Sequence, residues 1–178
     1  KITPIIFETW MEILKKTENS VLWLLIDDIV AKRNIERETA NSGVSIDRII
    51  YASRVSYKEH LKRLKFIDLF LDTFPYGAHT TAKEAISMGI PLITLMGKSF
   101  ASRVASSILS DIGLQKLITK NNEEYINLAV KLRKDKNKLS KIKDFLNKSE
   151  TIDKIHNSQK FTKDIEKIYI KMLKLAYS

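Results

Sequence analysis

Apolar residues in this chain gather into short continuous runs and into longer stretches with helical spacing. An almost continuous run fills residues 20–26, and further segments of strand length that are rich in apolar residues lie at 48–53, 67–73 and 90–96. Runs of this length are typical of strands that are buried on both faces, as in parallel sheets. A fifth, shorter strand is expected at 116–119.

Between these runs, apolar residues recur every three or four positions, which is the spacing of one helix face. In the first such stretch Ile6, Trp10 and Ile13 share a face, Ser56 is an N-cap candidate for another, and Gly89 ends a third. Helices are expected at 4–17, 34–41, 56–66, 79–88, 99–112, 121–135, 137–149 and 161–177.

The alternation of strands and helices predicts βαβ units, whose right-handed crossovers build a parallel sheet with helices on both faces. The expected fold class is therefore α/β, with a doubly wound, Rossmann-like parallel sheet. No linker divides the chain, so residues 1–178 are expected to form one domain, with an α/β core at 1–120 and C-terminal helices at 121–178. Ligands of such sheets bind at the carboxyl ends of the strands.

The loop "DTFPYGAHTT", residues 72–81, follows the third expected strand and leads into a helix. Its small residues let the backbone approach a ligand closely, and the first amides of a helix have no partners within the helix. A phosphate at this position would gain these amides, the hydroxyls of Thr80 and Thr81, and the ring of His79 as donors. The alternative is an ordinary helix cap, since threonine caps helices routinely.

Two neighbouring loops carry further basic residues. Arg103 falls in the first turn of the helix expected at 99–112, where a cation opposes the helix dipole, so its partner is either a carboxylate or a bound anion. Lys58 and His60 follow the second strand and can reach the same edge of the sheet. A solvated amphipathic helix would carry the same two residues, so the pattern alone does not decide between the two interpretations.

Composition narrows the classes of function. With 44% hydrophobic and 29% charged residues the chain is globular in type, and no apolar run is long enough to span a bilayer. The absence of cysteine excludes disulfides and thiolate metal sites, and it fits a cytoplasmic location. The 31 basic and 21 acidic residues give a net charge of +10, which indicates either an anionic partner or a lysine-rich solvated surface.

Several longer motifs resemble one known family in the right order along nearly the whole chain. They are "KITP" with Trp10, "NSVLWLL" (19–25), "RIIY" (48–51), "LDTFPYGAHTTAKEA" (71–85), "PLITLMGKSFASRVASS" (91–107) and "EEYINLAVKL" (123–132). The chain is similar to the C-terminal half of the catalytic region of O-linked N-acetylglucosamine transferases and their bacterial tetratricopeptide-repeat relatives, in glycosyltransferase family 41. The resemblance implies a GT-B glycosyltransferase, of which this chain is the half that grips the sugar-nucleotide donor.

The resemblance also implies roles for residues around the donor diphosphate. In the family the lysine of the "K-I-x-P" segment contacts the diphosphate, which corresponds to Lys1. The "H-T-T" turn binds the same group through amides and hydroxyls, which corresponds to His79, Thr80 and Thr81. No metal or other cofactor is then expected, because these groups stabilise the charge of the leaving group.

Further residues are assigned to the rest of the donor by the same resemblance. Glu84 takes the position of the acid that binds the ribose hydroxyls, where animal enzymes carry aspartate. Lys58 and His60 correspond to residues that contact the ribose and flank the base, in a segment one residue shorter than in animal relatives. Tyr76 falls where the family lines the sugar pocket.

The expected partners are a UDP-sugar, an N-terminal catalytic half, and an acceptor protein held through a region upstream of this chain. "KITPIIFETW" has no initiator Met, which indicates a piece of a longer protein. On its own the chain is expected to bind nucleotide weakly and to transfer no sugar. In the last helix an apolar stripe of Ile165, Ile168, Met172 and Leu175 is exposed if it packs on the missing half, and buried if it packs on its own sheet.

Other functions stay open from the sequence. Within the class, the donor alternatives are UDP-glucose, as in related bacterial N-glycosyltransferases, and GDP-fucose, as in a plant-type branch that departs from "AHTT" and "FASRVA". In another class, the charge of +10 permits a nucleic-acid-binding or scaffolding domain. The basic helices after residue 130 carry few aromatic residues that could stack on bases, so nucleic acid is the less favoured partner.

Overall fold

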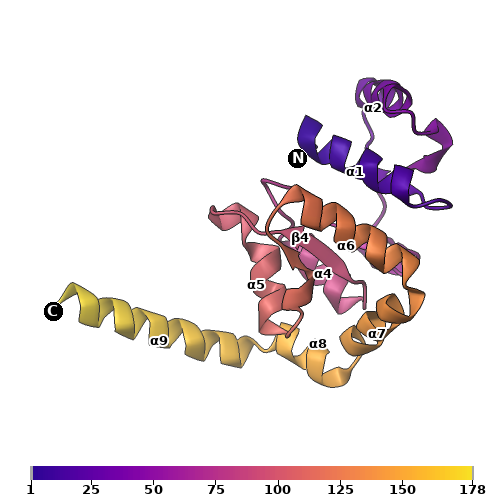
Figure 1. The fold of residues 1–178 in the computed structure, drawn as a ribbon. Coiled ribbons are helices and arrows are strands. Elements are labelled where there is room, and N and C mark those ends of the chain that lie inside the picture. The colour runs from indigo at the N-terminus through magenta and orange to yellow at the C-terminus, as the bar shows by residue number, and fades with distance from the viewer. Residues whose placement is uncertain (1, 178) are drawn as a thin grey trace.

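The computed structural model describes residues 2–177, in which short parallel strands alternate with helices (Figure 1). The strands are β1 (Leu22–Leu25), β2 (Ile49–Ala52), β3 (Phe70–Leu71), β4 (Leu92–Leu95) and β5 (Ile118–Thr119). The α-helices are α1 (Pro4–Lys16), α2 (Ile29–Asn41), α3 (Tyr57–Leu64), α4 (Thr80–Ser87), α5 (Val104–Asp111), α6 (Asn122–Lys134), α7 (Lys136–Leu146), α8 (Ser149–His156) and α9 (Ser158–Ala176). Short 3-10 turns are η1 (Ile46–Arg48), η2 (Phe100–Ser102) and η3 (Gln115–Leu117).

All strand pairs are parallel, which confirms the α/β fold class expected from the sequence. The strands lie in two separate sheets, one of β1 and β2 and one in the order β3-β4-β5. Leu22 lies opposite Ile49 in the first sheet, and Phe70 lies opposite Leu92 in the second. Within residues 2–177 no strand pairing joins β1 to β3, so the continuous doubly wound sheet is interrupted between them.

The two sheets differ in how completely the side chains of their strands are buried. In β4 the side chains of Leu92, Ile93 and Thr94 are all buried, as expected for a strand covered on both faces. In β1 Leu24 is buried whereas Leu25 is 50% exposed. The expectation that this run is buried throughout is therefore wrong for β1, because this strand has a neighbour on one edge only.

Local capping explains where the helices begin. Ser56 forms a capping box with Glu59 and starts α3, as the sequence predicts. The helix expected from Asn34 begins earlier, at Ile29, because the Asp28 carboxylate accepts a hydrogen bond from the Ala31 amide at 2.6 Å. The helix expected at 99–112 is divided into η2 and α5, and α8 was not expected.

The main core joins α1 and α6 to the two sheets. Trp10 of α1 and Tyr125 of α6 are both buried in this core, and Phe74 packs edge-on against Tyr125 with ring centroids 5.6 Å apart. The first expected helix face is confirmed, since Ile6, Trp10 and Ile13 are buried together. This core holds the loops that follow β3 and β4.

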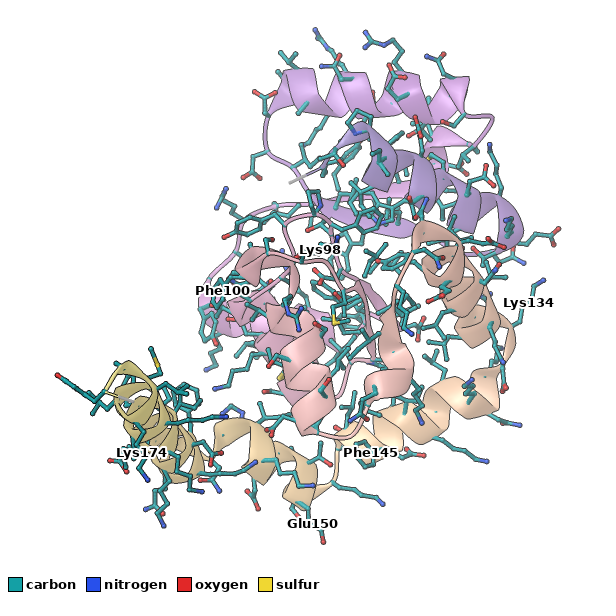
Figure 2. All side chains as sticks on the ribbon, turned by 60° about the vertical axis from the view of Figure 1, so that its left-hand side comes forward. Lys98, Phe100, Lys134, Phe145, Glu150 and Lys174 are labelled. Atoms are coloured by element: carbon teal, nitrogen blue, oxygen red, sulfur yellow. The ribbon has the colours of Figure 1, made fainter. Side chains whose placement is uncertain are left out.

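Helix α9 projects away from the remainder of the chain and ends at the C-terminus (Figures 1 and 2). None of its described residues is buried, and Ile168, Met172 and Leu175 are each more than half exposed. The stripe therefore does not pack on the sheet of this chain, which was one of the two expectations. None of the helices in residues 2–177 combines the length and the apolar composition that a membrane span needs.

Candidate functional site

The loop between β3 and α4 is built around the buried carboxylate of Asp72, which is 1% exposed. Its Oδ1 accepts a hydrogen bond from the Ala78 amide at 2.6 Å, and its Oδ2 accepts one from the Thr94 hydroxyl at 2.8 Å. The Asp72 carbonyl accepts a hydrogen bond from the Tyr125 hydroxyl at 2.8 Å. The carboxylate therefore ties the loop to β4, and the carbonyl ties it to α6.

A second anchor comes from the loop after β4. The Ala101 carbonyl accepts hydrogen bonds from the Gly77 amide at 2.9 Å and from Nε2 of His79 at 3.3 Å. A Cβ atom at Gly77 would lie 3.1 Å from Asp72 Oδ2 and 3.3 Å from the Ala101 carbonyl. Glycine is favoured here, because a side chain would force one of these two groups to move by a few tenths of an ångström.

Aromatic rings hold His79 on two sides. The ring of Tyr76 stacks on it at 5.3 Å, and the ring of Phe100 meets it edge-on at 5.8 Å. Phe100, labelled in Figure 2, lies on the loop between β4 and α5 and is 80% exposed. Because the carbonyl of Ala101 can only accept, the Nε2 atom of His79 carries the proton and Nδ1 is left as an acceptor in the neutral ring.

The N-terminus of α4 has no side-chain cap. His79 is the cap residue and its side chain makes no capping hydrogen bond, while Thr80 and Thr81 already belong to the first helical turn. Within residues 2–177 the amides of these three residues and both threonine hydroxyls have no hydrogen-bond partner. The alternative of an ordinary threonine cap is therefore wrong, and these donors are free to bind an anion.

A second cluster lies where α3 meets α4. His60 Nε2 lies 3.6 Å from Oε2 of Glu84, and Arg63 lies 3.2 Å from Nδ1 of the same histidine. Arg63 also donates to the Ser53 carbonyl at 2.6 Å, which ties α3 to the end of β2. The pKa of the Tyr57 hydroxyl is raised, first by desolvation and then by the charge of Glu84 and a hydrogen bond to it. Glu84 is thus the centre of this cluster.

Two other residues that the sequence singled out, Lys58 and Arg103, take no part in the contacts of these two clusters. Lys58 is exposed on the first turn of α3 and makes no ion pair with any described residue. Arg103 is exposed as well, and no carboxylate among residues 2–177 pairs with it, so of its two expected alternatives the salt bridge to a carboxylate is not formed. Lys1 lies outside the described residues.

Asp72 and Phe100 are parts of this site that the sequence interpretation missed. The one signal for Asp72 was an acid at the end of an apolar strand run, and its partners Thr94 and Tyr125 lie far along the chain. Within residues 2–177 no three His, Asp or Glu side chains gather in a way that could hold a metal ion. The independence from metal expected above stays a prediction.

The family model of glycosyl transferase family 41 matches residues 1–165, which include both clusters and every strand. The chain belongs to glycosyl transferase family 41. This confirms the family resemblance of its motifs.

Individual members of family 41 agree with this assignment. The chain is 34% identical over its full length to the probable UDP-N-acetylglucosamine--peptide N-acetylglucosaminyltransferase SEC of Arabidopsis thaliana, and covers 18% of that protein. It is 29% identical over 98% of its length to the UDP-N-acetylglucosamine--peptide N-acetylglucosaminyltransferase of Caenorhabditis elegans, and covers 15% of it. The chain thus spans about a fifth or less of the length of these curated relatives.

A solved structure supports the fold of this family 41 chain. A mutant of the Thermobaculum terrenum O-GlcNAc transferase superposes with a TM-score of 0.88 at 32% identity. The superposition covers 96% of this chain and 34% of that structure. The GT-B assignment from the sequence is confirmed at the level of fold.

Proposed function

We propose that this chain is the donor-binding part of a protein O-glycosyltransferase, which transfers N-acetylglucosamine from a UDP-sugar to serine or threonine of an acceptor protein. The observation that carries this proposal is the uncapped N-terminus of α4. His79, Thr80 and Thr81 present consecutive free amides there, and two free hydroxyls stand beside them. A diphosphate is the group whose charge and oxygen geometry match this set of donors.

The same donors give the chain a catalytic part to play. When the bond between the sugar and the diphosphate breaks, negative charge grows on the departing phosphate oxygen. Donors held at fixed positions stabilise that charge without reorganising during the reaction. Asp72 and Ala101 supply this rigidity, because they bind the backbone amides of Ala78 and Gly77, and Ala101 also binds the ring of His79. Lys1 is assigned to the same diphosphate by the family resemblance.

The second cluster, around Glu84 and His60, suits the nucleoside part of the donor. Glu84 can accept hydrogen bonds from two ribose hydroxyls, and His60 beside it holds the carboxylate in place. Following the family resemblance, Lys58 and His60 are proposed to contact the ribose and flank the base, and Tyr76 is proposed to line the sugar pocket. The names of the relatives support UDP-N-acetylglucosamine as the donor. UDP-glucose and GDP-fucose are the competing donors.

Ligand-dependent thermal unfolding tests the choice of nucleotide. The purified chain is titrated with UDP, GDP, uridine and UDP-sugars at equal concentrations, and the midpoint of unfolding is recorded. A ligand that binds only the folded state raises the midpoint. We expect a rise with UDP and a smaller rise with uridine, which lacks the diphosphate. A rise with GDP and none with UDP would contradict a UDP-sugar donor.

The nucleic-acid alternative has its own signature. A domain that uses its charge of +10 to bind phosphate backbones loses affinity steeply as salt rises. Fluorescence anisotropy with labelled single-stranded and double-stranded oligonucleotides, at two salt concentrations, measures this directly. We expect only weak association at low salt, with no competition by UDP.

A further inference from the structure

Glu84 lies on the face of α4 that also carries the two threonine hydroxyls. It follows Thr80 by four positions and Thr81 by three, so the three side chains share one side of the helix. The side chain of Glu84 is only 14% exposed. A donor bound at the N-terminus of α4 would therefore meet this carboxylate one helical turn further along.

Helix α3 supplies the partners that fix the direction of the Glu84 carboxylate. Nε2 of His60 lies 3.6 Å from Oε2 of Glu84, which is longer than a good hydrogen bond. The hydroxyl of Tyr57, in contrast, makes a hydrogen bond to the Glu84 side chain. Tyr57 and His60 are three positions apart, so they lie on the same face of α3.

Chemistry sets the direction of the hydrogen bond between Tyr57 and Glu84. Desolvation, and then the charge of Glu84 and the hydrogen bond to it, raise the pKa of Tyr57 above its ordinary value of 10.0. The hydroxyl therefore keeps its proton at neutral pH and is the donor. A carboxylate has about four lone-pair positions, so positions remain for both hydroxyls of a ribose.

Packing in the core does not explain the Tyr57 hydroxyl. The side chain is 65% exposed, and it begins α3 directly after the cap residue Ser56. Lys58, the next residue, is rotated about 100° around the helix axis and makes no ion pair with any described residue. Of these two neighbours on α3, Tyr57 is the one that contacts Glu84.

We propose that Tyr57 is a positioning residue of the donor site, which holds the Glu84 carboxylate in place for the 2′- and 3′-hydroxyls of a ribose. The inference rests on the proposed function and adds to it a residue that the family resemblance did not assign. Without the Tyr57 hydroxyl, Glu84 would have to be ordered when the ribose binds, and that ordering reduces affinity. Tyr57 and Glu84 together select a ribonucleotide over a deoxyribonucleotide.

Tyr57→Phe tests this role, because it removes the hydroxyl and keeps the ring. Dissociation constants of UDP and 2′-deoxy-UDP are measured for the variant and the parent chain by NMR titration, which suits weak binding. We expect the parent to bind UDP about tenfold more tightly than 2′-deoxy-UDP, because the carboxylate loses one hydrogen-bond donor in the deoxy form. In Tyr57→Phe this ratio should fall to about threefold or less, through weaker binding of UDP.

Glu84→Gln shows whether Tyr57 acts through the carboxylate. In the Glu84→Gln background Tyr57→Phe should not lower the ratio further, because the effects of two residues in one hydrogen-bond network do not add. Tyr169→Phe is the matched control. It removes the hydroxyl of another exposed tyrosine, on α9, and should leave both dissociation constants unchanged.

The outcomes separate this inference from the proposed function. An unchanged ratio in Tyr57→Phe, or an equal loss of affinity for both nucleotides, would overturn the positioning role. Tighter binding of UDP would do the same, because the hydroxyl would then compete with the ribose. So would a large fall in the thermal midpoint of Tyr57→Phe, which would assign the hydroxyl to stability. In all these cases the parent still binds UDP, whereas a parent chain that binds no UDP would overturn the proposed function itself.

Discussion

At the scale of single residues, the proposed diphosphate binding depends on a few donors that have no hydrogen-bond partner among the described residues. Thr80→Ala and Thr81→Ala each remove one hydroxyl that has no partner among the described residues. A hydrogen bond to a charged group contributes about 1.5–3 kcal/mol, so each change should weaken UDP binding by roughly tenfold or more. Calorimetric titration with UDP measures this, and the thermal midpoint should stay nearly constant.

Thr162→Ala is the matched control for these threonine variants. Its hydroxyl donates only to the Ser158 carbonyl on the exposed helix α9, so UDP affinity should not change. If both Thr80→Ala and Thr81→Ala retained full UDP affinity, the N-terminus of α4 would not be the diphosphate site.

Asp72 acts through the backbone that it holds. In Asp72→Asn one of the two carboxylate oxygens becomes an NH₂ group, which cannot accept from the Ala78 amide or the Thr94 hydroxyl. We expect a loss of about 1–3 kcal/mol in the free energy of unfolding, together with weaker UDP binding. Urea unfolding and UDP titration measure the two effects separately.

The control for Asp72 is Asp68→Asn, an exposed carboxylate that pairs only with Lys143. This variant should change neither quantity by much, because exposed ion pairs contribute little. Lower stability of Asp72→Asn with unchanged UDP affinity would show that Asp72 supports the core and does not position the loop.

The buried hydroxyl of Tyr125 makes the free energy of unfolding of the chain depend on pH in the alkaline range. Burial, and then the charge of Asp72, raises its pKa well above the ordinary value of 10.0. Above pH 10 the folded state therefore keeps a proton that the unfolded state has lost, and the free energy of unfolding falls as the pH rises. Below pH 10 Tyr125 is protonated in both states, and its contribution to the free energy of unfolding is fully present.

Tyr125→Phe tests this assignment. The variant loses the hydrogen bond to the Asp72 carbonyl and should be less stable at neutral pH by about 1–3 kcal/mol. It should also lose stability less steeply than the parent above pH 10, where the parent's Tyr125 resists ionisation. Urea unfolding at neutral and alkaline pH measures the stability and its dependence on pH. If the stabilities of Tyr125→Phe and of the parent fell equally steeply above pH 10, Tyr125 would not be the group that causes this loss.

At the scale of elements, the start of α3 was predicted correctly, because its capping residues stand next to it in the sequence. Ser56 and Glu59 lie three residues apart and start α3. Strand lengths were predicted poorly, because the run at 67–73 contributes only Phe70–Leu71 to a strand. The extent of a strand depends on where its neighbour runs, and apolar periodicity does not contain that information.

Helix α9 contributes almost nothing to the stability of the domain. It buries no described residue, and its ion pair from Lys160 to Asp111 is half exposed on both sides. Deleting residues 158–178 should change the thermal midpoint by only a few degrees, since an exposed pair contributes about 0–1 kcal/mol. Calorimetry checks this, and unfolding or aggregation of the shortened chain would show that α9 packs on the domain.

At the scale of the whole molecule, the proposal gives this chain one side of a donor site. The proposed diphosphate site at α4 and the proposed ribose site at Glu84 both lie in this chain, while the matched relatives are several times longer. We expect this chain to bind UDP with a dissociation constant on the order of 1 mM rather than 1 µM, and to transfer no sugar. Radiolabelled UDP-N-acetylglucosamine with peptide acceptors tests this, and measurable turnover by the chain alone would contradict it.

The sequence by itself determined the order of the five strands and of most helices, with α8 missed, and it determined the parallel α/β class and the loop that carries His79, Thr80 and Thr81. These features depend on apolar spacing and on residues close together in the chain, so local patterns contain them. Even the family could be identified from such motifs. The roles of His60 and Glu84 toward the nucleoside came from the family resemblance and stay predictions, whereas their 3.6 Å contact is known only from the structure.

Only the tertiary structure decided how the site is held and where the sheet is interrupted. The Asp72 carboxylate meets a residue 22 positions away, and its carbonyl meets one 53 positions away. Whether the first amides of α4 have hydrogen-bond partners likewise depends on which groups the fold brings near them. Such pairings arise when distant segments pack together, because burying a carboxylate requires partners that only the assembled core can place beside it.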